Sequence, residues 1–543
     1  VDVYLGQDDS RQANDLDWEI QQLVLRGSYV LGNHVITAGF EAEDIEVYNL
    51  FYQHVDTEIR FGGIDAFRNG DAARVYYGNA LTNNELDSAV YWGYAVNTAY
   101  LEDDWQITDS FNLNFGLRYD YYQSDDKPNL NQGFLADYGF GNDATLDGRD
   151  LLMPRLGFSW DLTDTVTLRG GVGLFSGGNP NVWYSNVYSN TNTTAVQVSS
   201  RNVDLFAQNY VLCEDTVPTC GPGYGVPDFL AEQVAAGDGS NFEIVYLDPN
   251  FDIPSEWKYA LGVTWIAPGD WVLSADLQVT RGEDTAIYKH GDLEFTGEFN
   301  DFGNGYPIYE SVRLPSFVLT NSKVGNESES VAFGAFKDFN NGFDMSLGYA
   351  YTDSKDVNPM TSSVAFSNYV NRAFYDPEEE VLSTSNYNIE HRVTGVFNYT
   401  AYWFGNNATR FSLFAQHSSG QPYSLVLGGF EGTELAYGST PYLDYIEHVL
   451  IEPGTRNNQD GSWFTKADLR VTQEFPGFSE GHRGSAFIVI ENLTNLINSE
   501  WGVMYKSNFP YGVTLSDLAA GNAQARIGDA SLWEIRVGLD YRF

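Results

Sequence analysis

The chain has 543 residues, of which 43% are hydrophobic and 15% aromatic, and its formal net charge at pH 7 is −45. This charge excludes a nucleic-acid-binding surface, because binding to phosphates depends on Lys and Arg. The hydrophobic content argues against a disordered chain, and no run approaches the roughly 18 consecutive apolar residues that a transmembrane helix requires. The length is compatible with several domains of about 150 residues or with one large β-barrel.

Strict alternation of apolar and polar residues recurs along the whole chain and predicts β-strands. Most of the predicted strands have about ten or more residues, which exceeds the usual strand of a globular protein and matches a tilted strand that crosses a bilayer. A fragment at 1–7 brings their number to about sixteen. In chain order, the other strands are expected at 16–30, 33–48, 90–107, 109–122, 152–162, 165–176, 256–266, 271–288, 328–339, 341–353, 387–400, 409–420, 462–475, 484–494 and 531–543.

The connections between these strands alternate between short and long. Short turns are expected at 31–34, 108–109, 163–165, 267–270, 339–342, 402–408 and 476–483. Long loops are expected at 49–89, 123–151, 177–255, 289–327, 354–386, 421–461 and 495–530. A soluble sandwich also alternates, but it rarely contains even one loop of such length. The pattern therefore predicts an all-β, transmembrane antiparallel β-barrel in the bacterial outer membrane, with short periplasmic turns and long extracellular loops.

Aromatic residues are concentrated next to the predicted short turns. Amphipathic rings favour the headgroup level of a bilayer, so we interpret these residues as an interfacial girdle in contact with outer-membrane lipid. The girdle residues are Trp105, Trp160, Trp265, Trp271, Phe339, Phe343, Tyr402, Trp403, Phe404, Phe475, Phe478, Tyr541 and Phe543.

Acidic residues are assigned mainly to the loops, for example Asp376–Glu380, Asp15–Glu19 and 143–150. We interpret them as a solvated surface, with a role in bridging calcium or lipopolysaccharide as the alternative. The segment Asn457–Trp463 is similar to half of a calcium-binding loop, but it lacks the alternating ligands and the terminal Glu. No cofactor is therefore expected, and a loop-bound Ca²⁺ stays as the weaker hypothesis.

Cys213 and Cys220 lie in the same long loop. Their even number and short spacing predict a disulfide in an oxidising exterior. Zinc is the alternative, but no His or further Cys lies close in sequence. No enzymatic activity is predicted, because the one G-x-S-x-G match, Gly477–Gly481, lies in a tight turn between two strands rather than between a strand and a helix.

Several segments resemble the barrel of TonB-dependent outer-membrane receptors, most closely the Oar-like branch, which often carries a carboxypeptidase-regulatory-like domain. The similarity spans roughly residues 16–543, and the segments that carry it are Tyr100–Tyr122, Met153–Phe175, Tyr387–Tyr399, Ser419–Ser424 and Glu491–Asn498. The end of the chain resembles the β-signal that the barrel-assembly machinery reads. Its residues are Trp533, Ile535, Val537, Leu539, Tyr541 and Phe543.

The resemblance implies a 22-stranded barrel, an N-terminal plug with a TonB box, and energy from the proton-motive force through TonB, ExbB and ExbD. Because residues 1–543 contain no plug and only about sixteen strands, we expect them to be the C-terminal portion of the barrel, without about six leading strands. The implied function is active uptake of a substrate captured by loops such as Asn179–Thr193. This substrate is a peptide or protein, a glycan or a metal chelate. The alternatives are a sixteen-stranded passive porin and a barrel-anchored surface or adhesion protein.

Charged residues of both signs fall on the face of the strands opposite the apolar one. We expect them to line the lumen and to bond to the plug or to water. The alternative is that they satisfy one another across neighbouring strands. These candidates are Arg118, Asp120, Arg155, Asp161, Arg169, Lys258, Asp276, Asp344, Lys466, Asp468, Arg470, Arg536, Asp540 and Arg542.

Overall fold

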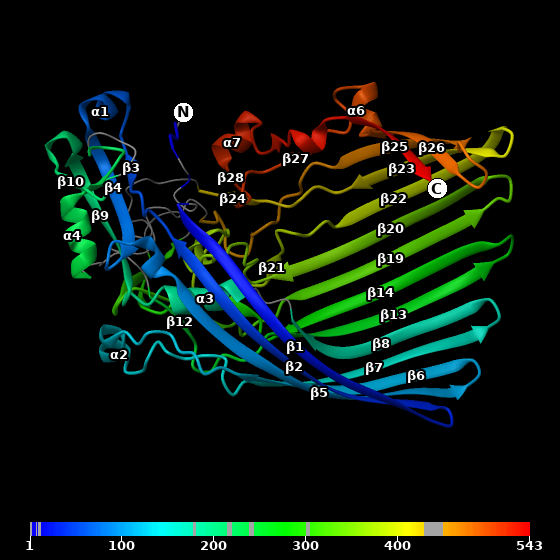
Figure 1. The fold of residues 1–543 in the computed structure, drawn as a ribbon, viewed down its shortest axis with the longest axis horizontal. Coiled ribbons are helices and arrows are strands. Elements are labelled where there is room, and N and C mark those ends of the chain that lie inside the picture. Colours follow the sequence, from blue (N-terminus) through cyan, green and yellow to red (C-terminus); the bar gives the residue numbers. More distant parts are fainter. Residues whose placement is uncertain are drawn as a thin grey trace.

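The computed structural model describes residues 3–6, 8, 12–177, 181–213, 220–237, 244–299, 305–427 and 449–543. It consists mainly of one curved antiparallel sheet, whose long strands follow one another in chain order (Figure 1). These strands are β1 (Ala13–Leu31), β2 (His34–Tyr52), β5 (Val90–Thr108), β6 (Phe111–Gln123), β7 (Asp150–Thr163), β8 (Val166–Ser176), β13 (Ser255–Ala267), β14 (Trp271–Glu283), β19 (Glu327–Asp338), β20 (Phe343–Asp356), β22 (His391–Phe404), β23 (Asn407–Ser418), β25 (Phe464–Pro476), β26 (Arg483–Glu491) and β30 (Glu534–Arg542).

The predicted all-β antiparallel fold of about sixteen strands is confirmed, with three corrections. The sixteenth strand is β21 (Ser383–Thr384), which pairs with the end of β20. The predicted strand at 1–7 is wrong where it can be checked, because residues 3–6 form no strand. The predicted strand 271–288 ends early, because Asp284 adopts a left-handed conformation (φ 51°) after which the chain leaves the main sheet.

The register keeps the apolar residues of neighbouring strands on one face of the sheet. Leu347 of β20, for example, lies opposite Ala335 of β19 and Gly395 of β22. Because the side chains of a strand have a period of two, a slip by one residue would move all of them to the other face. We call this side the apolar face and the opposite side the polar face.

The short turns lie together at one end of the strands, on the right in Figure 1. The turn between β19 and β20 requires a glycine, because Gly342 has φ 87° and a side chain there would contact the Thr400 carbonyl oxygen. Aromatic residues next to this turn contact one another. The ring centroids of Trp271 and Phe339 are 6.2 Å apart, and those of Phe339 and Phe343 are 5.3 Å apart.

The long connections lie mostly at the other end and form secondary structure of their own (Figure 1). The alternation of residues predicted only loops in these segments, without helices or strands. Their helices are α1 (Ile64–Asn69), α2 (Gln132–Tyr138), α3 (Asn181–Ser189), α4 (Asp228–Ala236), α5 (Ala365–Val370), α6 (Leu493–Ile497) and α7 (Leu515–Ala520), with 3-10 turns at Glu85–Ser88, Leu205–Ala207 and Asp529–Ser531. Their strands are β3 (Glu58–Arg60), β4 (Asp71–Ala80), β9 (Ala195–Asp204), β10 (Tyr210–Val211), β11 (Val226–Pro227), β12 (Ile244–Leu247), β15 (Ala286–His290), β16 (Leu293–Phe299), β17 (Pro307–Ser311), β18 (Ser316–Asn321), β24 (Ser424–Val426), β27 (Tyr505–Lys506), β28 (Gly512–Thr514) and β29 (Ala525–Arg526).

The sheet has two edges, β1 and β30. Within the described part of the chain, β1 pairs only with β2 and β30 only with β26. Nearly every residue of β1 is exposed. Among the same residues, no helix is long and apolar enough to cross a membrane.

Candidate functional site

The charged residues that the alternation selects all share the polar face of the sheet. The strand register decides this, since each of them lies beside residues of the same face on the neighbouring strands. Fourteen positions have this placement: Arg118, Asp120, Arg155, Asp161, Arg169, Lys258, Asp276, Asp344, Lys466, Asp468, Arg470, Arg536, Asp540 and Arg542.

Arg118 shows how the wall holds most of these charges. Its guanidinium lies 3.1 Å from a carboxylate oxygen of Glu41 on β2 and 2.9 Å from one of Asp120 on its own strand. A third bond of 3.0 Å goes to the Thr98 hydroxyl on β5. The arginine therefore ties three strands together through charge-assisted hydrogen bonds.

Other charged residues of the polar face are also paired within the wall. Arg169 lies 2.6 Å from Asp276, and Arg536 lies 3.0 Å from Glu491. These pairs are between half-exposed and exposed, so each contributes at most about 1 kcal/mol to stability. Further contacts are Lys466–Asp468 (3.1 Å), Lys258–Glu256 (3.3 Å), Arg542–Asp540 (3.6 Å), Thr167–Asp161 (2.7 Å) and Asn398–Asp344 (2.9 Å).

Arg155 and Arg470 differ from the other predicted arginines of the polar face, because each lies over an aromatic ring. The guanidinium carbon of Arg155 is 4.5 Å from the centroid of Phe175, and that of Arg470 is 4.3 Å from the centroid of Phe487. Arg470 also donates from Nε to the Thr472 hydroxyl, 3.2 Å away. Stacking on a ring orients a guanidinium and still leaves in-plane N–H groups available for an acceptor.

Several long loops share one large hydrophobic cluster, which we call the loop core. It contacts the polar face of β2 and β5 near the loop end of these strands. Its buried residues are Ile45, Val47, Trp92, Leu146, Tyr184, Val187, Tyr188, Val245, Leu247, Phe251, Ile253, Ala286, Tyr288, Phe317, Leu319, Ala365 and Tyr369. The cluster joins four long loops, those between β6 and β7, β8 and β13, β14 and β19, and β20 and β22, so these four loops form one packed assembly rather than independent excursions.

An aromatic stack connects the loop core to the wall. The ring of Trp92 lies 4.9 Å from that of Tyr188 and 5.9 Å from that of Tyr94, with nearly parallel planes. Helix α3 covers this stack and contains no charged residue. Its Ser185 hydroxyl accepts from the indole N–H of Trp92 (2.8 Å), and its Asn181 accepts from the Tyr94 hydroxyl (2.8 Å). A small apolar cleft lies beside the stack.

The sequence analysis did not select Trp92 or Tyr94, although β5 carries a signal for them. The polar-face positions of β5 change from Thr98, Tyr100 and Glu102 near the short turns to Trp92 and Tyr94 near the loops. Such an inversion of polarity along one face marks the point where the strand meets a second hydrophobic core.

The loop Asn179–Thr193, expected to capture substrate, is described from residue 181 onwards. Tyr184 and Tyr188 are buried at 7% and 9% exposure, so these two rings pack in the loop core and present no surface to a ligand. They are buried because α3 lies against the wall residues of β5.

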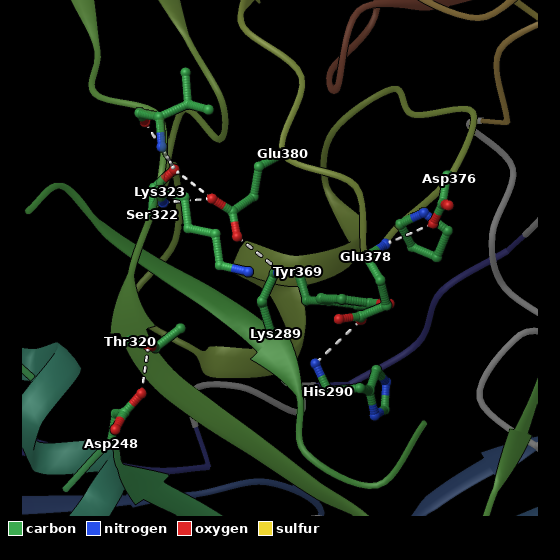
Figure 2. A network of polar contacts seen from close by, with 12 residues as sticks. Asp248, Lys289, His290, Thr320, Ser322, Lys323, Tyr369, Asp376, Glu378 and Glu380 are labelled. Atoms are coloured by element: carbon green, nitrogen blue, oxygen red, sulfur yellow. Dashed lines mark hydrogen bonds and ion pairs between the residues drawn. The ribbon is translucent and has the colours of Figure 1, made fainter. Parts of the chain in front are cut away.

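The acidic segments also need correction. Asp15–Glu19 lies within β1 and not in a loop. In the segment Asp376–Glu380, the carboxylates of Asp376, Glu378 and Glu380 accept hydrogen bonds from neighbouring elements, and Figure 2 shows those of Glu378 and Glu380. The interpretation as a purely solvated surface is therefore wrong for these three residues.

A buried polar pair lies beside this segment. The His290 and Asp292 side chains are 3% and 2% exposed, with 3.0 Å between Nδ1 and Oδ1. Burial by itself raises the pKa of Asp292, but its bonds with His290, Ser311 and Ser316 outweigh the burial and hold the pKa below its ordinary value.

The remaining predicted sites have the following positions. Cys213 and Cys220 form a disulfide. Asn457, in the segment compared with a calcium loop, uses its side-chain amide to bond the Thr384 carbonyl (2.8 Å) and Asn386 (2.6 Å). Within the described ranges, no group of three or more His, Cys, Asp or Glu residues could hold a metal ion.

The six residues compared with the β-signal lie along the edge strand. Ile535, Val537, Leu539 and Tyr541 alternate along β30, while Trp533 and Phe543 flank it. Val537 and Leu539 are 77% and 78% exposed, which places apolar side chains on the outer surface of the sheet.

A family model described as an outer membrane beta barrel domain matches residues 3–486. The chain belongs to this family. The predicted location in the bacterial outer membrane is thereby confirmed. No curated protein matches the sequence of this outer-membrane barrel.

Several solved structures are similar to this chain at low sequence identity. The outer membrane transporter YddB from Escherichia coli is 12% identical, with a TM-score of 0.50 over 97% of this chain and 55% of that chain. The siderophore receptor PirA from Acinetobacter baumannii is 12% identical, with a TM-score of 0.47 over 89% and 51%. The ferric enterobactin receptor PfeA from Pseudomonas aeruginosa is 10% identical, with a TM-score of 0.45 over 96% and 53%. The chain spans about half the length of these proteins.

Proposed function

We propose that this chain is the C-terminal part of the barrel wall of a TonB-dependent active transporter. Further strands would close the gap between the edges β1 and β30, and a plug domain would fill the barrel. The observation that carries the proposal is the polar face, which is lined with charged residues. This face remains widely exposed between the loop core and the short turns. The Arg169 side chain, for example, is 46% exposed and that of Arg536 is 58% exposed. A wall of this kind requires a polar interior. The half-length match to an outer membrane transporter agrees with it.

In this mechanism the wall must bind a plug firmly and also release it. Most wall arginines are bound to wall carboxylates, as Arg118 is. Arg155 and Arg470 are held by aromatic rings instead, so their N–H groups can bond to a plug carboxylate without breaking an ion pair of the wall. We therefore assign these two residues as the main charged contacts of the plug.

The proposed partners follow from the same assignment. TonB, ExbB and ExbD would deliver the energy through the plug, and the barrel-assembly machinery would read the residues from Trp533 to Phe543 during insertion. The loop side would capture the substrate, and its class is a peptide or protein, a glycan or a metal chelate. Lipid and lipopolysaccharide would surround the apolar face.

Uptake by cells tests the proposal. Cells with and without this protein are given a labelled peptide, oligosaccharide or ferric chelate, each in the presence and absence of a protonophore. We expect one class to accumulate only when the protein is present, and accumulation to stop when the proton gradient collapses. Uptake that continues after the collapse would contradict active transport and favour a passive porin. Surface binding without accumulation would favour an adhesion protein.

A further inference from the structure

The segment Asp376–Glu380 belongs to the loop between β20 and β22 and carries four acidic residues. It forms a turn, in which the Glu379 N–H bonds the Asp376 carbonyl oxygen at 3.4 Å. In Figure 2 the Glu378 and Glu380 side chains point towards the neighbouring loop, between β14 and β19, and the Asp376 carboxylate faces the backbone N–H of Glu378. Glu379, which lies between Glu378 and Glu380, is exposed.

Glu380 makes the strongest of the three contacts. Its carboxylate lies 2.8 Å from Lys289 Nζ of β15, and these side chains are only 10% and 23% exposed. It also accepts from the Ser322 hydroxyl at 3.0 Å and from the backbone N–H of Lys323. Burial by itself raises the pKa of Glu380, but these donors outweigh the burial and hold the pKa below its ordinary value.

Glu378 and Asp376 each make one contact with the β14–β19 loop and one contact within their own loop. Glu378 accepts from the Tyr369 hydroxyl of α5 at 2.7 Å and from the backbone N–H of His290 at 3.3 Å. Asp376 accepts from the Tyr309 hydroxyl of β17 at 2.8 Å and from the backbone N–H of Glu378 at 2.9 Å. Burial and the neighbouring Asp376 carboxylate raise the pKa of Tyr309, so this phenol stays a donor at neutral pH.

We propose that Asp376, Glu378 and Glu380 form a carboxylate latch that holds the β20–β22 loop closed on the β14–β19 loop, so that both move as one lid over the loop end of the barrel. The latch depends on ionised carboxylates, because hydrogen bonds to charged acceptors are about twice as strong as those between neutral groups. Acid therefore opens it.

The sign of the pH dependence follows from Glu380. A carboxylate whose pKa is lower in the folded protein contributes stability above its unfolded pKa and loses it as the pH falls through the folded value. The latch is thus closed at neutral pH and opens below about pH 4. The charged and titratable groups that face it are Lys289, His290, Asp292, Tyr309, Tyr369, Arg372 and Glu379.

Hydrogen exchange of the full chain in lipid vesicles tests the latch, because three of its donors are the backbone amides of His290, Lys323 and Glu378. The variant Asp376→Asn/Glu378→Gln/Glu380→Gln keeps the shape and removes the charges. At pH 7 we expect exchange at these amides to rise about tenfold. In the wild type, after correction for the intrinsic rate, the protection of the Lys323 amide falls below about pH 4, and in the variant it does not change.

Two controls separate the latch from a general loss of folding. Glu379→Gln removes one charge from the same segment at an exposed position and leaves exchange unchanged. Amides within β19 and β20 keep their protection in every variant. Lys289→Met removes the ion pair with Glu380 from the side of the other loop, and we expect it to reproduce the faster exchange at Lys323. Equal exchange in the triple variant and the wild type, or an equal rise in Glu379→Gln, would overturn the proposal.

Discussion

Individual charged residues of this barrel have very different surroundings, and their contributions to stability differ accordingly. Arg456 and Asp356 form an ion pair of 2.8 Å with side-chain exposures of only 4% and 8%. Arg456 also bonds to the Ser383 carbonyl oxygen. Lys355, which directly precedes Asp356 in the sequence, forms an ion pair of 2.9 Å with Asp353. These two side chains are 39% and 35% exposed.

Removing Arg456 leaves a buried carboxylate without its cation, whereas removing Lys355 leaves a carboxylate in water. We expect Arg456→Met to lower the free energy of unfolding by about 3–5 kcal/mol and Lys355→Met by at most about 1 kcal/mol. Denaturant titration of the protein in lipid vesicles measures both values. Equal losses for the two variants would show that burial does not set the contribution of these pairs.

At the scale of the strand, the decisive feature is which face a side chain occupies. In β20, Leu347 lies on the apolar face among Met345 and Tyr349, while the adjacent Ser346 lies on the polar face. A cation on a lipid-facing surface near the middle of a bilayer is costly, and one on the water-filled side is not.

Leu347→Arg and Ser346→Arg therefore form a matched pair. We expect Leu347→Arg to destabilise the folded barrel by about 2–4 kcal/mol, and Ser346→Arg to have a much smaller effect. The heat-dependent mobility of the folded protein in gels, together with denaturant titration in vesicles, reports the difference. If Ser346→Arg were the more damaging change, the assignment of the two faces would be reversed.

The whole molecule is an open sheet whose edges differ in length. β1 has 19 residues and β30 has 9, and in the described part of the chain neither has a partner on its outer side. A strand edge with unpaired backbone groups is unfavourable within a membrane. If further strands complete the wall, as we propose, the backbone groups of both edges are paired.

Engineered disulfides distinguish this arrangement from direct closure. In cells that make the protein, cysteines at Ser28 and Asp540 are expected to stay unlinked, because intervening strands separate β1 from β30. The positive control is a pair at Ser28 and Thr37, which lie opposite each other with 2.9 Å between their hydroxyl oxygens. Efficient cross-linking of Ser28→Cys with Asp540→Cys would show that the two edges pair directly, as in a smaller porin.

The sequence by itself determined the strands, their faces and the end at which the long loops lie. The period of two is a local property, so it can be read without knowing the neighbours of a strand. Arg118 and Asp344 were assigned to the same face in this way, and the strand register places them so.

Only the tertiary structure decided what the loops do. Tyr184 and Tyr188 resemble surface residues in sequence, and Glu379 cannot be told from Glu380, yet α3 buries the two tyrosines and Lys289 binds only one of the glutamates. These outcomes depend on contacts between residues about 90 positions apart, as between Trp92 and Ser185 or Lys289 and Glu380. A loop lacks the periodicity that reveals its buried side, so burial in the loops follows from packing between segments and not from local pattern.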